Sequence, residues 1–389
     1  MSTIAVNREI IQWARTRAER SGLTIDALVK RFPKFLAWES GDVQPTLSQL
    51  ELLARKTFTP LGYFFLQNPP DDRLPIPDFR TVGDREIHYP SPNLLETVQT
   101  MQRRQSWMHD FLVEELEEPL SFVGSLTLST EIVEAATRIR ETLALEDGWA
   151  RRQSTWQDAL NILRENIEQA GILVAASSVV GNNNHRKLDV NEFRGFVLND
   201  NYAPLIFVNA ADYKSANMFT LAHEVVHVWL GEGGVFNLNF RTLESDDNEI
   251  ERYCNKVAAE LLVPEQELRA LWPDTQQREE PFQFIARRFK VSPLVAARRA
   301  LDLGFITREE FFAFFEAYRI DERRKKDKKS DGGDFYNTQN VRIGKRFASA
   351  VIRATKESRL LYRDAYQLTN LYGTTFDKYA KSLGFTIGT

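Results

Sequence analysis

The stretch His223-Glu224-Val225-Val226-His227 decides how this chain is interpreted. In an α-helix, residues four positions apart lie on one face, so both imidazoles can bind one Zn²⁺ ion. The glutamate between them lies about a quarter turn away, where it can act on a water bound to the metal. The chain contains only five histidines. The pattern therefore predicts a metal centre rather than a helix that carries two core histidines by chance.

The residues around this motif predict a buried helix. Burying two imidazoles and a carboxylate in such a helix is costly unless a partner such as a metal compensates them. We expect Asp212 to cap the start of the helix and Gly231 to end it. Apolar side chains surround the motif on nearly all sides, namely Phe219, Leu221, Ala222, Val225, Val226, Val228, Trp229 and Leu230.

A catalytic zinc site needs three protein ligands and one open position, so a third ligand must come from further along the chain. A second amphipathic helix is predicted over residues 248–263, where apolar residues recur at helical spacing. Glu251 lies at the edge of its apolar stripe, where a carboxylate can point inward. Glu249 and Glu260 lie nearer the other edge, and the pattern alone leaves all three open as the ligand.

Three segments together resemble the ImmA/IrrE family of metallopeptidases. They are Phe219–His227, Glu251–Asn255 and Ala258–Pro264. The resemblance implies that Glu251, four residues before Asn255, is the third zinc ligand. It also implies a thermolysin-like catalytic core around the H-E-x-x-H helix. For several members of the family it implies limited proteolysis of a repressor, under stress or in mobile elements.

Three apolar runs before the motif predict strands at 171–175, 193–198 and 204–208, and Asn199-Asp200-Asn201 is typical of a hairpin turn between the last two. Zinc peptidases of this kind bind the substrate backbone by strand addition at a sheet edge. We expect the strand at 194–198 to provide that edge. The candidate substrate-binding residues are therefore Arg194, Gly195, Phe196 and Val197. The alternative is an ordinary half-buried strand.

Composition and periodicity divide the chain into five segments. They predict an α+β fold class with a small sheet and with helical N-terminal and C-terminal domains, and the resemblance implies that the core is a zincin-like metallopeptidase. The N-terminal domain covers 1–68, and a proline-rich linker covers 69–93. The metallopeptidase domain covers 94–320 and begins with helical patterns at 94–118, 130–144 and 153–170. A charged, glycine-containing linker at 321–333 leads to a helical extension at 334–389.

The segment 1–68 resembles the helix-turn-helix domain of repressor-like regulators, because Trp38-Glu39-Ser40-Gly41 matches the turn that follows their recognition helix. Between the second helix and this turn there is only Pro33-Lys34-Phe35-Leu36-Ala37. A turn plus a recognition helix is several residues longer. Proline and apolar residues are also poor base-reading groups. We therefore expect a degenerate domain that docks protein, with weak DNA binding.

Whole-chain properties restrict the class of protein further. The net charge of −4 gives no general attraction to nucleic acid. The single cysteine, Cys254, cannot form an intrachain disulfide and is predicted to be a small core residue. No apolar run approaches the roughly 18 residues that span a membrane, and the N-terminus has no signal-peptide pattern. We therefore expect a cytoplasmic protein without a membrane partner.

These patterns and the resemblance predict a zinc-dependent endopeptidase. One Zn²⁺ per chain is held by His223, His227 and Glu251, and Glu224 acts as general base. The expected partner is a regulatory protein, either a repressor or a toxin encoded nearby. Two alternatives stay open: an antitoxin-like or regulatory binding protein that grips a partner with little turnover, and a DNA-binding regulator.

Overall fold

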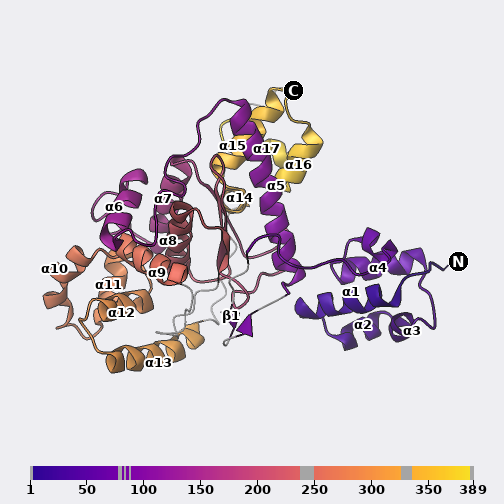
Figure 1. Cartoon of the computed structure of the whole chain (residues 1–389), viewed down its shortest axis with the longest axis horizontal. Coiled ribbons are helices and arrows are strands. Elements are labelled where there is room, and N and C mark those ends of the chain that lie inside the picture. Colours follow the sequence, from indigo (N-terminus) through magenta and orange to yellow (C-terminus); the bar gives the residue numbers. More distant parts are fainter. Residues whose placement is uncertain are drawn as a thin grey trace.

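A computed structural model of the chain describes residues 3–77, 81–82, 85–86, 89–236, 249–325 and 335–385. It has the mixed α+β fold that the sequence predicts. A small four-stranded sheet lies between two groups of helices, and the N-terminus belongs to a separate helical domain (Figure 1). None of the helices in the described ranges combines the length and the apolar character that a membrane span requires.

The central sheet consists of β3 (Leu173–Ser177), β4 (Gly195–Leu198), β5 (Leu205–Asn209) and β6 (Gly234–Phe236), in the order β3-β5-β4-β6. β5 runs parallel to β3, whereas β4 is antiparallel to both β5 and β6. The expected hairpin turn joins β4 to β5, and Asp200 stabilises it by accepting hydrogen bonds from the Tyr202 and Ala203 N–H groups. The first three strands therefore lie close to their predicted positions.

Two groups of helices cover the two faces of the sheet (Figure 1). Successive strand residues point to opposite faces, so Val197 and Ile206 pack with one group, while Phe196 and Phe207 pack with the other. Because both faces are covered, every residue of β4 and β5 is buried. The first group includes α6 (Ile132–Thr142), α7 (Trp156–Gln169), α8 (Lys214–Leu230) and α9 (Glu249–Leu262), and the second includes α5 (Pro92–Glu114), α15 (Lys345–Lys356), α16 (Tyr362–Thr369) and α17 (Thr374–Ser382).

The helices expected at 94–118, 130–144 and 153–170 are present as α5, α6 and α7, with ends shifted by a few residues. α5 begins two residues earlier than expected, because the Ser91 side chain accepts a hydrogen bond from the Leu94 N–H and Pro92 occupies the first helical position. The expected proline-rich linker at 69–93 therefore overlaps the first two residues of α5.

The motif helix α8 starts differently from the sequence prediction and ends as predicted. Asp212 is not its N-cap: Tyr213 takes that position without a side-chain hydrogen bond, and Asp212 instead forms an ion pair with Arg194 at 2.7 Å. Gly231 ends the helix in the left-handed region, with φ 73°. An added Cβ at Gly231 would lie 3.1 Å from the Gly124 Cα, so glycine is required by both the turn and the close packing.

The N-terminal domain consists of short helices around a core of its own. Helix α3 includes Trp38, Glu39 and Ser40 of the expected Trp-Glu-Ser-Gly turn, and its Phe35 and Trp38 are buried in that core. These two side chains therefore hold the domain together and are not available to read bases. The elements are α1 (Arg8–Arg20), α2 (Ile25–Arg31), α3 (Phe35–Ser40), α4 (Leu47–Lys56) and the 3₁₀ helix η1 (Leu61–Phe65).

The proline-rich segment that follows this domain contacts structured parts on both sides. Asp72 is buried and forms ion pairs with Arg17 and Arg20 of α1. Leu74 and Ile76 pack against the core on the α5 side of the sheet. The Val235 N–H of β6 then donates a hydrogen bond of 3.0 Å to the Pro77 carbonyl oxygen. The segment is thus attached to the outer edge of the sheet, shortly before the small hairpin β1 (Thr81–Val82) and β2 (Arg85–Glu86).

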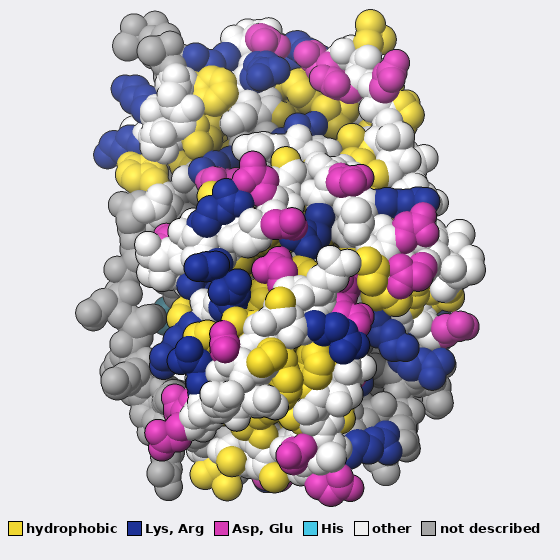
Figure 2. All heavy atoms as spheres, turned by 90° about the vertical axis from the view of Figure 1, so that its left-hand side faces the viewer, with side chains coloured by type: hydrophobic (Ala, Val, Ile, Leu, Met, Phe, Trp, Pro, Cys, Tyr) yellow, Lys and Arg dark blue, Asp and Glu magenta, His cyan; other side chains and the backbone are white. Residues whose placement is uncertain are grey.

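The expected charged linker at 321–333 is wrong in its first part. Helix α13 (Arg308–Lys325) continues through residues 321–325, and the remainder of the expected linker lies outside the described residues. Helix α13 follows three shorter helices, α10 (Glu265–Thr275), α11 (Pro281–Phe289) and α12 (Pro293–Asp302). On the face that these helices share with α6, basic, acidic and apolar side chains are interspersed, and the charges form no single basic surface there (Figure 2).

The C-terminal extension packs directly on the sheet. It begins with α14 (Phe335–Ile343), which lies against the edge strand β3, and turns into α15 at Gly344. An added Cβ at Gly344 would lie only 2.7 Å from the Val174 carbonyl oxygen of β3, and φ is 86°, so only glycine fits at this point. The extension is therefore part of the same packed body as the sheet.

Candidate metal centre

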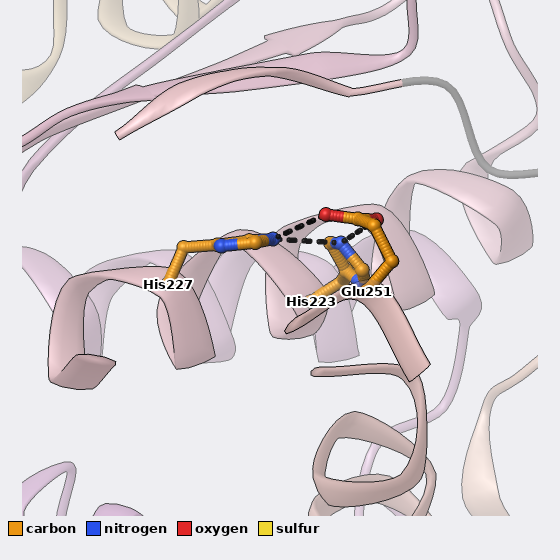
Figure 3. Close-up of side chains that lie close together, drawn as sticks. All are labelled: His223, His227 and Glu251. Carbon is orange, nitrogen blue, oxygen red and sulfur yellow. Dashed lines mark hydrogen bonds and ion pairs between the residues drawn. The ribbon is translucent and has the colours of Figure 1, made fainter. Parts of the chain in front are cut away.

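Three side chains from two helices meet at one point, as Figure 3 shows. The His223 Nε2 and His227 Nε2 atoms are 3.0 Å apart. The Glu251 carboxylate lies 3.2 Å from each of them, through Oε2 to His223 and through Oε1 to His227. Among the described residues this group brings together three potential ligand atoms within 4.8 Å of one another. All three side chains are buried.

The helices α8 and α9 produce this geometry. One turn of α8 separates the two histidines, so their rings project from the same face. α9 packs against α8 through its apolar stripe and presents Glu251 from its first turn. Glu249 is exposed, and Glu260 is buried in an ion pair with Arg299, so neither of these two carboxylates belongs to the group.

A hydrogen bond from α9 fixes one of the imidazoles. His223 Nδ1 lies 3.1 Å from the Asn255 Oδ1. Because an amide oxygen only accepts, this contact assigns the proton to Nδ1 and leaves the Nε2 lone pair free for a metal. Cys254, expected as a core residue, is fully buried, and its sulfur also lies 3.7 Å from His227 Nδ1. Burial raises the pKa of the Cys254 thiol well above its usual value, which keeps it uncharged.

The charge states of His227 and Glu251 suit a metal ion such as zinc. Burial lowers the pKa of His227 and so favours the neutral imidazole. Burial alone would raise the pKa of Glu251, but the two imidazoles beside it lower the value to about 2. Two neutral imidazole nitrogens and one carboxylate oxygen are a ligand set that zinc binds in catalytic sites.

Glu224 completes the site without being one of its three potential ligands. Its side chain is 1% exposed, and its Oε2 atom accepts no hydrogen bond from any described residue. Burial and the negative charge of Glu251 raise the pKa of Glu224 well above its usual value. A buried carboxylate with an orphaned oxygen requires an additional partner, and a metal with its water supplies both positive charge and a hydrogen-bond donor.

The expected substrate-binding residues lie near the site but not at the sheet edge. β4 is paired on both sides, with β5 and with β6, so the prediction that residues 194–198 form the edge is wrong. The short strand β6 occupies the edge instead. Gly195 contacts the site through its backbone: an added Cβ would lie 2.5 Å from the Glu224 Oε1. Arg194 is held in its ion pair with Asp212, and Phe196 and Val197 point into the two cores.

Comparisons with known families agree with this site. Residues 167–301 match the Peptidase_M78 model, which is described as the IrrE N-terminal-like domain. The match confirms the ImmA/IrrE resemblance for the part of the chain it covers, and it supports a metallopeptidase-like function. Residues 343–382 match a model described as a domain of unknown function, DUF8813. Neither match covers the helix-turn-helix-like region. No curated protein matches the chain.

Proposed function

We propose that this chain, which carries a peptidase domain of the ImmA/IrrE family, is a zinc-dependent endopeptidase. The observation that carries the proposal is the meeting of three buried ligand atoms beside a buried glutamate that has no partner for one oxygen. A structural zinc site would be closed by a fourth protein ligand, whereas a catalytic one keeps a position open. Among the described residues the group offers three ligand atoms, which fits the second case.

In the proposed reaction, His223, His227 and Glu251 would hold the zinc ion. When bound, the ion lowers the pKa of a coordinated water and polarises the peptide carbonyl. Glu224 accepts the proton of the attacking water and then delivers it to the leaving amine. Asn255 keeps the His223 ring in the tautomer that ligation needs, and the missing side chain of Gly195 leaves the space that the Glu224 carboxylate occupies.

The substrate is proposed to bind as an added strand along β6, since β6 forms the sheet edge. The N–H of Val235 on that edge already donates to Pro77, so a substrate strand would compete with the chain's own proline-rich segment. Competition of this kind suits limited proteolysis of a selected protein better than general digestion. From the family resemblance we propose that the substrate is a regulatory protein such as a repressor, in stress or mobile-element regulation in the cytoplasm.

A second candidate is a binding protein of regulatory or antitoxin type, with little turnover. The observation that favours it is the depth of the site: His223, His227 and Glu224 are at most 1% exposed. Such a protein would grip its partner by surfaces outside the metal centre. Its function would then not depend on Glu224.

Substitution of Glu224 separates these candidates. The full chain and its Glu224→Gln variant are each produced together with the protein encoded beside it, and cleavage is followed by mass spectrometry. We expect Glu224→Gln to keep zinc and the partner but to lose cleavage, because an amide cannot accept the proton of water. Glu141→Gln, on an exposed position of α6, is the matched control and should cleave normally. Undiminished biological activity in Glu224→Gln would refute the peptidase function in favour of the binding protein.

A further inference from the structure

A cavity of about 460 Å³, separate from the candidate metal centre, lies between the peptidase domain and the C-terminal extension. None of the four metal-centre residues lines it. One wall comes from α7, β3, β5 and the start of α8, and the other comes from α14 and the first residue of α15. The volume falls in the range of about 300–1,000 Å³ that is typical of small-molecule sites.

The cavity has an excess of positive charge. Arg164, Lys214 and Lys345 line it, together with one acidic residue, Glu165. Glu165 is already used, because its Oε1 lies 2.8 Å from the Lys345 Nζ. Arg164 and Lys214 form no ion pair with any described residue, which leaves two positive charges for a ligand.

Arg164 is buried but has few hydrogen-bond acceptors near its guanidinium group. It is 8% exposed, and it donates one long hydrogen bond of 3.4 Å to the Asn161 Oδ1. Burial lowers the pKa of the Arg164 guanidinium, so its charge is destabilised where it lies. The buried Glu168 behind the wall compensates it in part only, because burial raises the pKa of that carboxyl to about 7. An anion in the cavity would stabilise the guanidinium.

Neutral hydrogen-bonding groups line the rest of the cavity. Asn217 is 4% exposed, and its Oδ1 accepts no hydrogen bond from the described residues. Lys214 is the first residue of α8, so the positive end of the helix dipole lies at the same place. Amides that both donate and accept suit the heteroatoms of an organic ligand. They come from Gln157, Asn161, Asn217, Asn337 and Asn340.

We propose that this cavity binds a small phosphorylated organic molecule, with its phosphate between Arg164 and Lys214 and its body against the amides of α14. A phosphate dianion matches the positive charges of Arg164 and Lys214, and one guanidinium group can bind two phosphate oxygens at once. Such a ligand connects the C-terminal extension to the first turn of the motif helix. The site is independent of the proposed peptidase function, since none of its residues belongs to the metal centre.

The test uses the full chain and two probes, inorganic phosphate and adenosine monophosphate. Adenosine is the control without a phosphate, and chloride at equal ionic strength is the reference. Binding is measured by calorimetry and by the shift of the melting temperature. We expect both probes to bind, the nucleotide at least as tightly as phosphate, and adenosine at least tenfold more weakly than the nucleotide, since a charged hydrogen bond is worth about a factor of ten or more. Hydrogen exchange in α14 should slow when the nucleotide binds.

Two variants localise the binding. Lys214→Gln changes an exposed residue at the mouth of the cavity and is expected to fold normally, while Arg164→Gln changes a buried one. Each should weaken both probes about tenfold or more, whereas Lys378→Gln, on an exposed position of α17, should not. The proposal is overturned if the unmodified chain binds neither probe at millimolar concentration, or if Lys214→Gln binds them unchanged. If the nucleotide binds far more weakly than inorganic phosphate, the proposal that the ligand is an organic phosphate is overturned.

Discussion

Gly195→Ala tests whether the position of the Glu224 carboxylate matters for catalysis. The added methyl group would lie 2.5 Å from the Glu224 Oε1, whereas ordinary contact begins at 3.4 Å, so the carboxylate must retreat by about 0.9 Å. Gly195 lies in β4 without positive φ, so alanine suits the backbone itself. A displacement of about 1 Å at a reacting group costs about 100-fold in rate. We expect kcat/KM to fall by about that factor.

The same variant should keep its metal and its fold. The three atoms nearest to the added Cβ belong to Glu224 and Thr220 and not to the potential ligands. Overpacking by one methyl group should lower the free energy of unfolding by about 1–3 kcal/mol. The assay compares cleavage of a proteome-derived peptide library, zinc content and thermal unfolding. Gly62→Ala is the control, because its added Cβ contacts nothing within 4 Å. Full activity in Gly195→Ala, or loss of its zinc, would refute this reasoning.

Three further predictions concern the ligands, the pH dependence and the N-terminal domain. Elemental analysis should find about one equivalent of zinc in Glu249→Ala and in Glu260→Ala but not in Glu251→Ala. Glu260→Ala should lower the free energy of unfolding by about 3–5 kcal/mol, because its buried partner Arg299 is left unpaired. If Glu249→Ala loses the zinc instead, Glu251 is not the third ligand. Burial raises the pKa of Glu168 from 4.5 to about 7, so its contribution to stability is complete below pH 4.5 and lost as the pH rises through 7. In urea titrations Glu168→Gln should therefore match the unmodified chain at low pH and exceed it by about 3 kcal/mol above pH 8, and a constant difference would contradict the shift. The full chain should select no consensus from a random duplex pool, since the short helix α3 buries its aromatic residues, and one tight consensus would overturn this.

The grouping of side chains at the candidate metal centre was largely predictable from the sequence, because its main determinant is local. The spacing of His223 and His227 fixes their common face on any α-helix, and burial followed from the apolar residues around them. Glu251 was not distinguishable from its neighbours by periodicity, and it needed the family resemblance. Asn255 lies on α9 one turn after Glu251 and contacts His223 of α8, and the Glu-x-x-x-Asn spacing was the sequence signal for this contact.

The features that sequence reasoning missed depend on segments far apart in the chain. β6 has only three described residues, and nothing in Gly234–Phe236 indicates that it covers β4. The pairing of Glu260 with Arg299 and the bond between Val235 and Pro77 likewise join distant positions. Asp212 has the side chain of a helix cap, but an ion pair with Arg194 competes for it. Tertiary contacts of this kind override local preference.

The most direct test of the central claim is a hydrolysis experiment in ¹⁸O-labelled water. The full chain, loaded with one equivalent of zinc, is incubated with a proteome-derived peptide library, and new C-termini are analysed by mass spectrometry. We predict new C-termini that carry ¹⁸O in the unmodified chain and a yield at least about 100-fold lower in Glu224→Gln with the same zinc content. Absence of labelled C-termini from the zinc-loaded chain, or equal yields from both proteins, would contradict the account.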